Sequence, residues 1–382
     1  MRILPENRLE ECTHVQYHGE YSANEKAAMD VIGRGTDFNP TNRFERLAVV
    51  DDWEHLETTE NDDAPRKLAT ELFDDQSQSV VSENKSPDLS FRYSLNPYRG
   101  CVHGCSYCYA RPYHEFLGFS AGLDFETKIM VKRDAAPLFR KFLARPSYRC
   151  ELIVMSGVTD CYQPIERQFA VTRACLEVAS AANQPIGVIT KNALVTRDLD
   201  LLADMATRNL VQVNVSVTSL DQTLTRKMEP RTSSPTARLR AIRELSAAGV
   251  PVHVMTAPII PGLNDSEIPK ILEAVAAAGA VGAGYTILRL PHAVKEIFLH
   301  WLAQHLPEAK ERVESRLRAV RSGELTNSQF GARMRGEGPI AQQIDQTFRV
   351  FKKRYGLDSP SLQLDTTQFR RPDKSGRQKS LF

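Results

Sequence analysis

From about residue 150 onward, the chain alternates between short apolar runs and longer amphipathic stretches. The apolar runs are rich in β-branched residues, as strands are, and cover residues 152–157, 186–191, 210–219, 252–260 and 284–290. Apolar residues recur every three or four positions between them, which predicts helices over residues 165–182, 197–207, 237–248 and 266–278. Gly249 and Gly279 follow the last two stretches, as glycine often does where a helix ends. Strands and helices that alternate at this spacing predict parallel βα units.

The number of these units limits the architecture. With the segment that leads into residue 96, the pattern gives about six βα units, fewer than a closed eight-unit barrel contains. We therefore expect an α/β fold, a partial (β/α)6 TIM-type barrel over residues 90–291. Chemistry in such folds gathers at the C-terminal ends of the strands, so functional residues are expected there.

Segments of different composition flank the predicted core. Residues 1–50 are expected to form an N-terminal extension, which includes the turn-rich stretch VIGRGTDFNPTNRFERL. Residues 51–89 are expected to form an acidic flexible connector, because residues 51–85 carry eleven Asp or Glu against three Lys or Arg. Residues 292–356 predict a C-terminal helical segment, and residues 357–382 a disordered basic tail.

Charge and hydropathy limit the expected compartment and the expected partners of the protein. The formal net charge of +2 over 382 residues is too small to indicate nucleic acid as a partner. The sequence has neither an apolar run long enough to span a membrane nor a signal-peptide pattern, so we expect a cytoplasmic protein with no membrane partner. Basic residues do cluster in TRKMEPRTSSPTARLRAIR and in the tail. A phosphate-binding surface and a solvated helix face both explain such clusters.

Three cysteines stand close together in NPYRGCVHGCSYCYARPYHEF. Cys101, Cys105 and Cys108 follow a C-x3-C-x2-C pattern. A structural zinc site normally has four protein ligands, and a disulfide joins a pair. Three thiolates leave one coordination position open, which indicates that a substrate or a reactive cofactor binds there. In a reducing compartment, such a cluster favours metal binding or catalysis over disulfides.

This spacing, with the aromatic Tyr107 before the third cysteine, resembles the cluster motif of the radical S-adenosylmethionine (SAM) superfamily. The resemblance implies that three thiolates hold three irons of a 4Fe-4S cluster, while SAM binds the fourth. It also implies that an electron from a reductant protein such as a flavodoxin or ferredoxin releases a 5'-deoxyadenosyl radical from SAM. A zinc site is the alternative interpretation of the same cysteines.

Within that superfamily, residues 90–291 resemble the spore photoproduct lyase branch and its DNA repair photolyase-like relatives. The segments that carry the resemblance are GCVHGCSYCYAR and MEPRTSSPTARLRAIRELSAAGVPVHVMTAPII. It implies a set of residues that contact SAM. In this set Lys191 meets the SAM carboxylate and Ser216 meets the ribose. These residues are Tyr107, Ser156, Gly157, Thr159, Asp160, Lys191 and Ser216. Polar residues at strand ends also satisfy backbone groups or solvate a barrel rim, so that interpretation stays open.

Two further residues are candidates for the radical chemistry. Tyr109 resembles a lyase tyrosine that passes the radical on, although packing against the cysteine loop explains it equally well. The lyase cysteine that returns a hydrogen atom has no counterpart, because Gly157 stands at its position and Cys161 follows Asp160 instead. Cys161 is therefore a displaced hydrogen-atom donor or an unreactive small residue.

Other residues near these motifs favour supporting roles. His103 lies inside the cysteine loop, and we expect it to face solvent or support the loop rather than bind metal. Glu229 and Arg231 either touch substrate or form a turn before a helix. Cys175 follows the apolar period of its helix and is expected in the core.

Two functional hypotheses remain from the sequence. The first is a radical SAM enzyme that cleaves SAM reductively and abstracts hydrogen from a substrate. That substrate stays open among a damaged or modified base in DNA, an RNA nucleotide and a peptide, and the lyase resemblance favours nucleic acid, as in DNA repair. The second is a non-enzymatic nucleic-acid-binding protein stabilised by zinc or by a cluster, motivated by the same cysteines and the basic segments.

Overall fold

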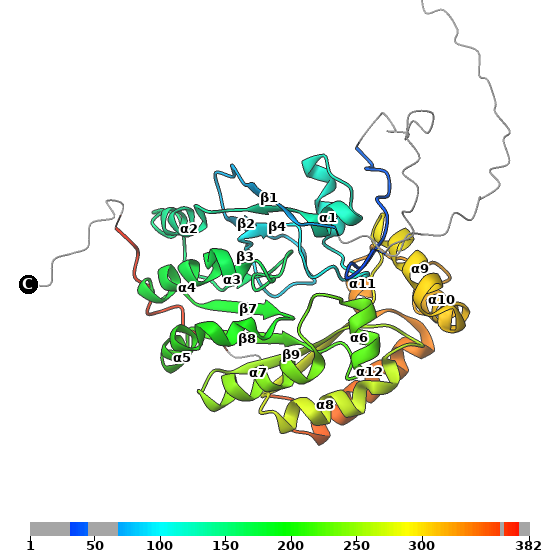
Figure 1. Ribbon diagram of the computed structural model, residues 1–382. Helices are drawn as coiled ribbons and strands as arrows, with labels where there is room; N and C mark the ends of the chain where they lie inside the picture. Colours follow the sequence, from blue (N-terminus) through cyan, green and yellow to red (C-terminus); the bar gives the residue numbers. More distant parts are fainter. Residues whose placement is uncertain (1–30, 45–67, 360–362, 374–382) are drawn as a thin grey trace, which may run out of the picture.

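The computed structural model describes residues 31–44, 68–359 and 363–373 of the chain (Figure 1). Its β-structure consists of short strands with these bounds: β1 Glu71–Asp74, β2 Val81–Glu83, β3 Tyr93–Leu95, β4 Tyr98–Arg99, β5 Lys128–Val131, β6 Ile153–Met155, β7 Ile186–Thr190, β8 Val211–Ser216, β9 Val252–Ile259 and β10 Gly282–Ile287. Seven of these strands form the main sheet in the order β10-β9-β8-β7-β6-β3-β2. A smaller sheet has the order β1-β5-β4, and β4 leads directly into the cysteine loop.

Helices connect the strands of the main sheet and cover it. The α-helices have these bounds: α1 Leu123–Thr127, α2 Ala135–Leu143, α3 Glu166–Phe169, α4 Val171–Ala181, α5 Leu199–Thr207, α6 Gln222–Met228, α7 Pro235–Ala247, α8 Ile268–Ala277, α9 Val294–His305, α10 Lys310–Ala319, α11 Ala332–Arg335 and α12 Gly338–Arg354. Short 3-10 helices occur at η1 Arg111–Tyr113, η2 Glu115–Leu117, η3 Ala193–Asp198, η4 Asp265–Glu267 and η5 Pro307–Ala309.

The predicted repeat of parallel βα units is confirmed. Strands β3, β6, β7, β8, β9 and β10 run parallel to their neighbours, and the edge strand β2 pairs antiparallel with β3. Within the described residues, β10 and β2 form the two ends of the sheet and do not pair with each other, so the barrel is not closed. The strand arrows of β7 and β8 point toward the region that contains α6, α9 and α11 (Figure 1).

The two faces of the main sheet have different environments, which follows from the alternation of side chains along each strand. One face is apolar and fully buried beneath the helices, as at Val211, Val213 and Val252. The neighbouring positions Asn214 and His253 are paired across β8 and β9 and lie half-buried on the opposite face. The parallel sheet therefore has a dry face and a partly open face.

Two predicted helical stretches are interrupted. The stretch over residues 165–182 divides at Ala170, whose φ of 50° is left-handed and ends α3 before α4 begins. The stretch after residue 292 divides into α9 and α10 at Pro307, because proline lacks the amide that would continue the helical hydrogen bonds.

The flanking segments also differ from expectation where the structure describes them. Residues 71–74 and 81–83, which fall in the predicted connector, form β1 and β2, because neighbouring strands supply their backbone partners. Residues 1–30 and 45–67 lie outside the described residues. In the predicted tail, Leu357 is fully buried, and the guanidinium of Arg371 donates to the carbonyl of Tyr148 at 3.0 Å.

The two ends of the sheet are linked by polar contacts of the loop between β2 and β3, which enters β3 at its N-terminal end. Asp88, which lies between β2 and β3, accepts a hydrogen bond from the Gly331 amide at 2.6 Å and pairs with Arg333 of α11. Arg333 also donates to the Ser86 hydroxyl at 2.5 Å. These contacts join the loop 84–92 to the segment that follows α10, across the gap in the barrel. No helix among the described residues has the length and apolar character needed to cross a membrane.

Candidate functional site

The cysteine loop, residues 101–108, lies between β4 and η1 and is largely buried. Cys101 and Cys105 are each 7% exposed, Cys108 is half-buried, and all three thiols are free. Gly104 has a φ of 66° in the middle of the loop, where a side chain would meet the carboxylate of Glu126. The loop thus requires glycine at this turn and brings three thiols into the interior.

The chemistry of these thiols fits a group that supplies positive charge. Burial raises the pKa of Cys101, Cys105 and Cys108, so buried thiolates need compensation from a cation. Iron provides that compensation for thiolates in iron-sulfur clusters. Within the described residues, no three His, Cys, Asp or Glu side chains are grouped as ligands of a single metal ion. A 4Fe-4S cluster does not need such grouping, because each thiolate binds a different iron.

A buried carboxylate, Glu126 of α1, holds one side of the cysteine loop. It pairs with the fully buried guanidinium of Arg111, which also donates to the carbonyl of Cys105 at 3.0 Å. The Gly35 amide donates to both carboxylate oxygens of Glu126 at 3.2 and 3.0 Å. Arg34 donates to the backbone carbonyl of Glu126 at 2.7 Å. The described part of the N-terminal extension is therefore attached to the cysteine loop through α1.

The MEPRT segment after α6 holds the other side of the loop. The Ser106 amide donates to the carbonyl of Met228 at 3.0 Å, and the Arg231 amide donates to the carbonyl of His103 at 3.3 Å. The Tyr107 hydroxyl donates to the Glu229 carboxylate. The sequence left two roles open for this segment, substrate contact or a simple turn. The structure adds a third role, because the segment fixes the cysteine loop in place.

Glu229 is the centre of a buried charged network. Its carboxylate pairs with Arg238 of α7 and accepts from the Thr218 hydroxyl at 2.6 Å. Burial alone would raise the pKa of Glu229, but the charges of Arg238 and Lys191 and the hydroxyls of Thr218 and Tyr107 lower it to about 2. Glu229 is therefore ionised at neutral pH and fixes the orientation of the Tyr107 ring.

The loop after β6 contains several of the predicted SAM contacts. Ser156 has a φ of 73°, unusual for a residue with a side chain, and its hydroxyl accepts from the Cys161 amide at 2.7 Å. The Tyr109 hydroxyl donates to the carbonyl of Gly157 at 2.9 Å. The Thr159 hydroxyl donates to the carbonyl of Tyr98 at 2.8 Å. The serine and threonine side chains thus serve backbone groups of the loop and of β4.

Asp160 links the loop after β6 to the end of β7. Its carboxylate accepts from the Thr190 hydroxyl and from the Lys191 amide, both at 2.8 Å. The imidazole of His103 lies 3.4 Å from the same carboxylate and 3.1 Å from the Asn192 side-chain nitrogen. His103 is 2% exposed, so it supports the loop rather than facing solvent. Asp160 thereby ties the cysteine loop to two strand ends.

Lys191 and Ser216 lie at the ends of neighbouring strands. The Lys191 ammonium lies 5.9 Å from the centre of the Tyr107 ring and has no carboxylate within ion-pair distance among the described residues. Ser216 ends β8, and its carbonyl accepts from Arg238 at 3.1 Å. The structure therefore brings Tyr107, Lys191 and the Glu229 network together, with Ser216 connected through Arg238.

The two candidates for radical chemistry have opposite environments. Tyr109 is 45% exposed beside Cys108. Cys161 is completely buried in the main hydrophobic core, where the Thr172 hydroxyl donates to its carbonyl at 2.6 Å. Cys175 is likewise buried in that core, as its helical position predicts.

Comparison with known proteins agrees with this site. Residues 95–275 match the Radical SAM superfamily, and this span contains the cysteine loop and every strand-end residue described above. An uncharacterised protein of Mycobacterium tuberculosis is 41% identical over 234 residues, which is 60% of this chain and 69% of that protein. An uncharacterised protein of Methanocaldococcus jannaschii is 26% identical over 246 residues, 64% of this chain and 88% of that protein. This chain belongs to the radical SAM superfamily.

Solved structures of the superfamily show the same fold. A spore photoproduct lyase variant with bound AdoMet and dinucleoside spore photoproduct has a TM-score of 0.53 and 17% identity, covering 74% of this chain and 78% of that chain. A spore photoproduct lyase complexed with dinucleoside spore photoproduct has a TM-score of 0.54 and 16% identity, covering 74% and 79%. Membership of the superfamily confirms the predicted cofactors, a 4Fe-4S cluster and SAM.

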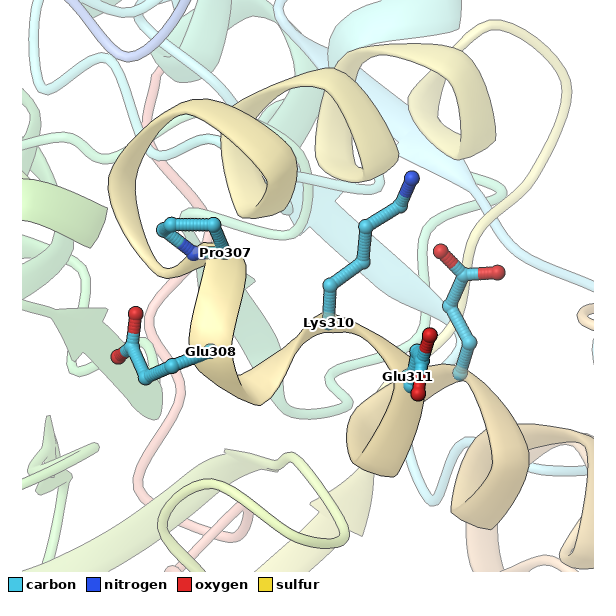
Figure 2. A pocket seen from close by; sticks show the side chains of 5 residues that line it. Pro307, Glu308, Lys310 and Glu311 are labelled. Carbon is cyan, nitrogen blue, oxygen red and sulfur yellow. The ribbon is translucent and has the colours of Figure 1, made fainter.

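The radical SAM site contains residues that the sequence did not single out. Glu126 and Gln163 both hold the cysteine loop, the latter by accepting from the Val102 amide at 2.8 Å. No sequence period marks them, because their partners lie far away in the chain. A surface hollow on the C-terminal helices contains none of the predicted site residues (Figure 2). It is lined by Pro307, Glu308, Lys310, Glu311 and Glu314.

Proposed function

We propose that this radical SAM enzyme abstracts a hydrogen atom from a base in nucleic acid, in a lyase-type reaction of the kind used in DNA repair. The observation that carries the proposal is the attachment of the three-thiol loop to the strand ends through Asp160 and Glu229. Both carboxylates join the loop to the positions where SAM is expected. The nucleic-acid substrate is supported by the fold shared with spore photoproduct lyase and by the exposed basic residues Arg226 of α6 and Arg243 of α7.

The cofactors supply the chemistry and the chain supplies their position. When bound, a reduced 4Fe-4S cluster gives one electron to SAM, which yields methionine and a 5'-deoxyadenosyl radical. Cys101, Cys105 and Cys108 would hold three irons. Lys191 suits the SAM carboxylate because its ammonium has no acidic ion-pair partner among the described residues, and Ser216 suits the ribose.

The two catalytic candidates receive different support. Tyr109 is half-exposed beside Cys108, a suitable place for a residue that passes a radical to or from substrate. Cys161 is completely buried, and this favours the interpretation in which it is a small core residue. A hydrogen-donor role for Cys161 would require the loop after β6 to open.

The proposal includes a partner and a compartment. A reductant protein such as a flavodoxin or ferredoxin would deliver the electron, and a reducing cytoplasm would keep the three thiols available for iron.

Variants of two cysteines test the enzyme proposal. In Cys108→Ala a cluster ligand is lost, so anaerobic reconstitution should give low iron content and little 5'-deoxyadenosine from SAM. Cys161→Ala removes a thiol of the core and leaves the cluster ligands intact, so iron content and uncoupled SAM cleavage should stay near wild type. Iron analysis and chromatography of 5'-deoxyadenosine measure both.

The outcomes separate the possible roles. Iron loss in Cys161→Ala would make that thiol part of the cluster site, and wild-type SAM cleavage in Cys108→Ala would contradict the assigned ligands. If Cys161→Ala gives altered or adducted products when substrate is present, the substrate radical has lost its hydrogen donor, and Cys161 would be that donor. A colourless wild-type protein that binds zinc tightly and does not cleave SAM would favour the non-enzymatic nucleic-acid-binding alternative.

A further inference from the structure

Three guanidinium groups gather where β10 ends, close to Tyr109. They belong to Arg289, Arg321 and Arg333, which we term the arginine cluster, and they come from the end of β10, the end of α10 and α11. Arg289 lies near enough to the other two for their charges to act on it, and the same holds for the phenol groups of Tyr109 and Tyr113. The arginine cluster therefore adjoins the residue that follows the third cysteine.

Two of the three arginines have structural partners. Arg321 is 2% exposed and donates to the carbonyls of Ala332 at 2.8 Å, Leu288 at 2.8 Å and Ile287 at 3.4 Å. Arg333 pairs with Asp88 and donates to Ser86. Arg321 thus holds the backbone at the end of β10, whereas Arg333 attaches α11 to the loop 84–92.

Arg289 has no comparable partner. Among the described residues it forms no ion pair with a carboxylate, and its guanidinium donates to the sulfur of Met334 at 3.6 Å, a weak acceptor. The nearby acid Asp88 already accepts from Gly331 and Arg333, and Glu337, near Arg321, accepts from the Ser322 hydroxyl at 3.0 Å. Burial and the charge of Arg333 lower the pKa of Arg289, in keeping with the weak acceptor it has.

A half-buried guanidinium without an acid partner favours an anion at this position. Arginine binds phosphate through two parallel N–H donors. Tyr109 and Tyr113, whose phenol groups lie within range of the Arg289 charge, are 45% and 56% exposed and provide flat surfaces on which bases can stack. Aromatic rings beside arginines are the usual arrangement in proteins that bind single-stranded nucleic acid.

We propose that Arg289 binds a backbone phosphate of a single-stranded or flipped-out nucleotide segment, and that Tyr109 and Tyr113 stack against its bases. This inference rests on the proposed function and specifies its substrate as a phosphodiester strand. Arg289 is a substrate-binding residue in this arrangement: a phosphate contact positions the strand and does not select its bases.

Binding of a labelled oligonucleotide tests the phosphate site. The probe is a fluorescein-labelled thymidine 12-mer, bound to the full, anaerobically reconstituted chain across a series of salt concentrations. We expect Arg289→Gln to bind about tenfold more weakly and to lower the slope of log affinity against log salt by about one. Arg349→Gln is the matched control, because it removes the same charge from an exposed pair with Asp345 on α12 and should bind like wild type.

Stability measurements exclude a folding defect as the cause. Arg289→Gln removes a cation that is repelled by its neighbours, so its melting temperature should equal or exceed that of wild type. Arg321→Gln should lower the melting temperature, because three backbone carbonyls lose their donor. A large fall in melting temperature in Arg289→Gln would identify it as structural and overturn the proposal.

Three further results would also overturn it. Equal binding of the oligonucleotide by Arg289→Gln and Arg349→Gln would show that Arg289 does not contact a phosphate. Competition by inorganic phosphate at the concentration of oligonucleotide phosphate would indicate a free-anion site, and equal binding of a polyglutamate peptide would indicate an acidic protein partner. If wild type cleaves SAM while any of these results holds, the phosphate site fails and the enzyme proposal stands; if wild type does not cleave SAM, the enzyme proposal fails.

Discussion

At the scale of single residues, two buried glutamates determine where the cysteine loop lies. Glu126 holds it from the side of α1 and Glu229 from the side of α6, and each pairs with a buried arginine. A buried ion pair is strongly destabilised when one partner is removed, because the other charge stays buried without compensation. These residues therefore act on the site without carrying its chemistry.

Glu229→Gln tests this role. The change leaves the Arg238 charge buried and unpaired, so we expect the free energy of unfolding to fall by about 3 kcal/mol. The pKa of Glu229 is lowered to about 2 from 4.5, so its contribution is present above pH 4.5 and is lost as the pH falls toward 2. In Glu229→Gln the free energy of unfolding should therefore not show this loss between pH 4.5 and pH 2. Urea unfolding at several pH values measures both effects.

Glu244→Gln is the control for that experiment. Glu244 pairs with Arg240 on the exposed surface of α7, so its loss should cost about 0.5 kcal/mol or less. Equal destabilisation by the two substitutions would contradict the role assigned to Glu229.

At the scale of elements, the segment 31–44 is part of the site because of one close contact. A side chain on Gly35 would place its Cβ 1.6 Å from the carbonyl oxygen of Gly104, so only glycine lets the two backbones meet. The carbonyl of Gly33 accepts from Arg231 at 2.8 Å, which attaches the same segment to the MEPRT segment. The extension thus contacts both supports of the cysteine loop.

Gly35→Ala should separate these backbones. Because neither backbone has room to move freely, we expect a loss of stability of about 1 to 3 kcal/mol and a lower iron content after reconstitution. Gly187→Ala is the matched control, since its Cβ would meet Val154 at an ordinary distance of 3.4 Å. Melting temperature and iron analysis provide the test, and the same values for both variants would show that the contact has no role.

At the scale of the whole molecule, the ends of an open parallel sheet are joined by side chains and not by a strand ladder. Asp88 connects the loop beside β2 to Gly331 and Arg333, next to the arginine cluster. Such a connection opens more easily than paired strands, because few hydrogen bonds hold it.

Asp88→Asn should loosen this connection. The charge-assisted bond to Arg333 is lost, so the segment that contains Arg333 should open more often than it does in wild type. Limited trypsin digestion should then cleave faster after Arg333 and Arg335, which mass spectrometry identifies. Asp74→Asn breaks an exposed pair with Arg133 and should leave the cleavage rate unchanged. Faster cleavage in both variants, or in neither, would argue against the connection.

Much of this fold follows from local patterns. The period of apolar residues predicted β6 to β10 and the helices between them, because side-chain alternation is a property of neighbouring positions. Within those elements, the break at Ala170 was missed, since a left-handed alanine has no signature in the sequence. β1 and β2 were missed because short edge strands depend on partners elsewhere in the chain.

The sequence by itself determined the chemistry: three cysteines at a fixed spacing lie on one short loop, so their convergence requires no distant contact. Only the tertiary structure decided what surrounds them. The sequence leaves Cys161 as a hydrogen-atom donor or an unreactive small residue, and the structure buries its thiol in the core while its amide donates to the Ser156 hydroxyl. Glu126 and Glu229 hold the cysteine loop although they lie 18 and 121 residues beyond Cys108 in the chain, and pairing over such distances is set by packing, which the order of residues does not display.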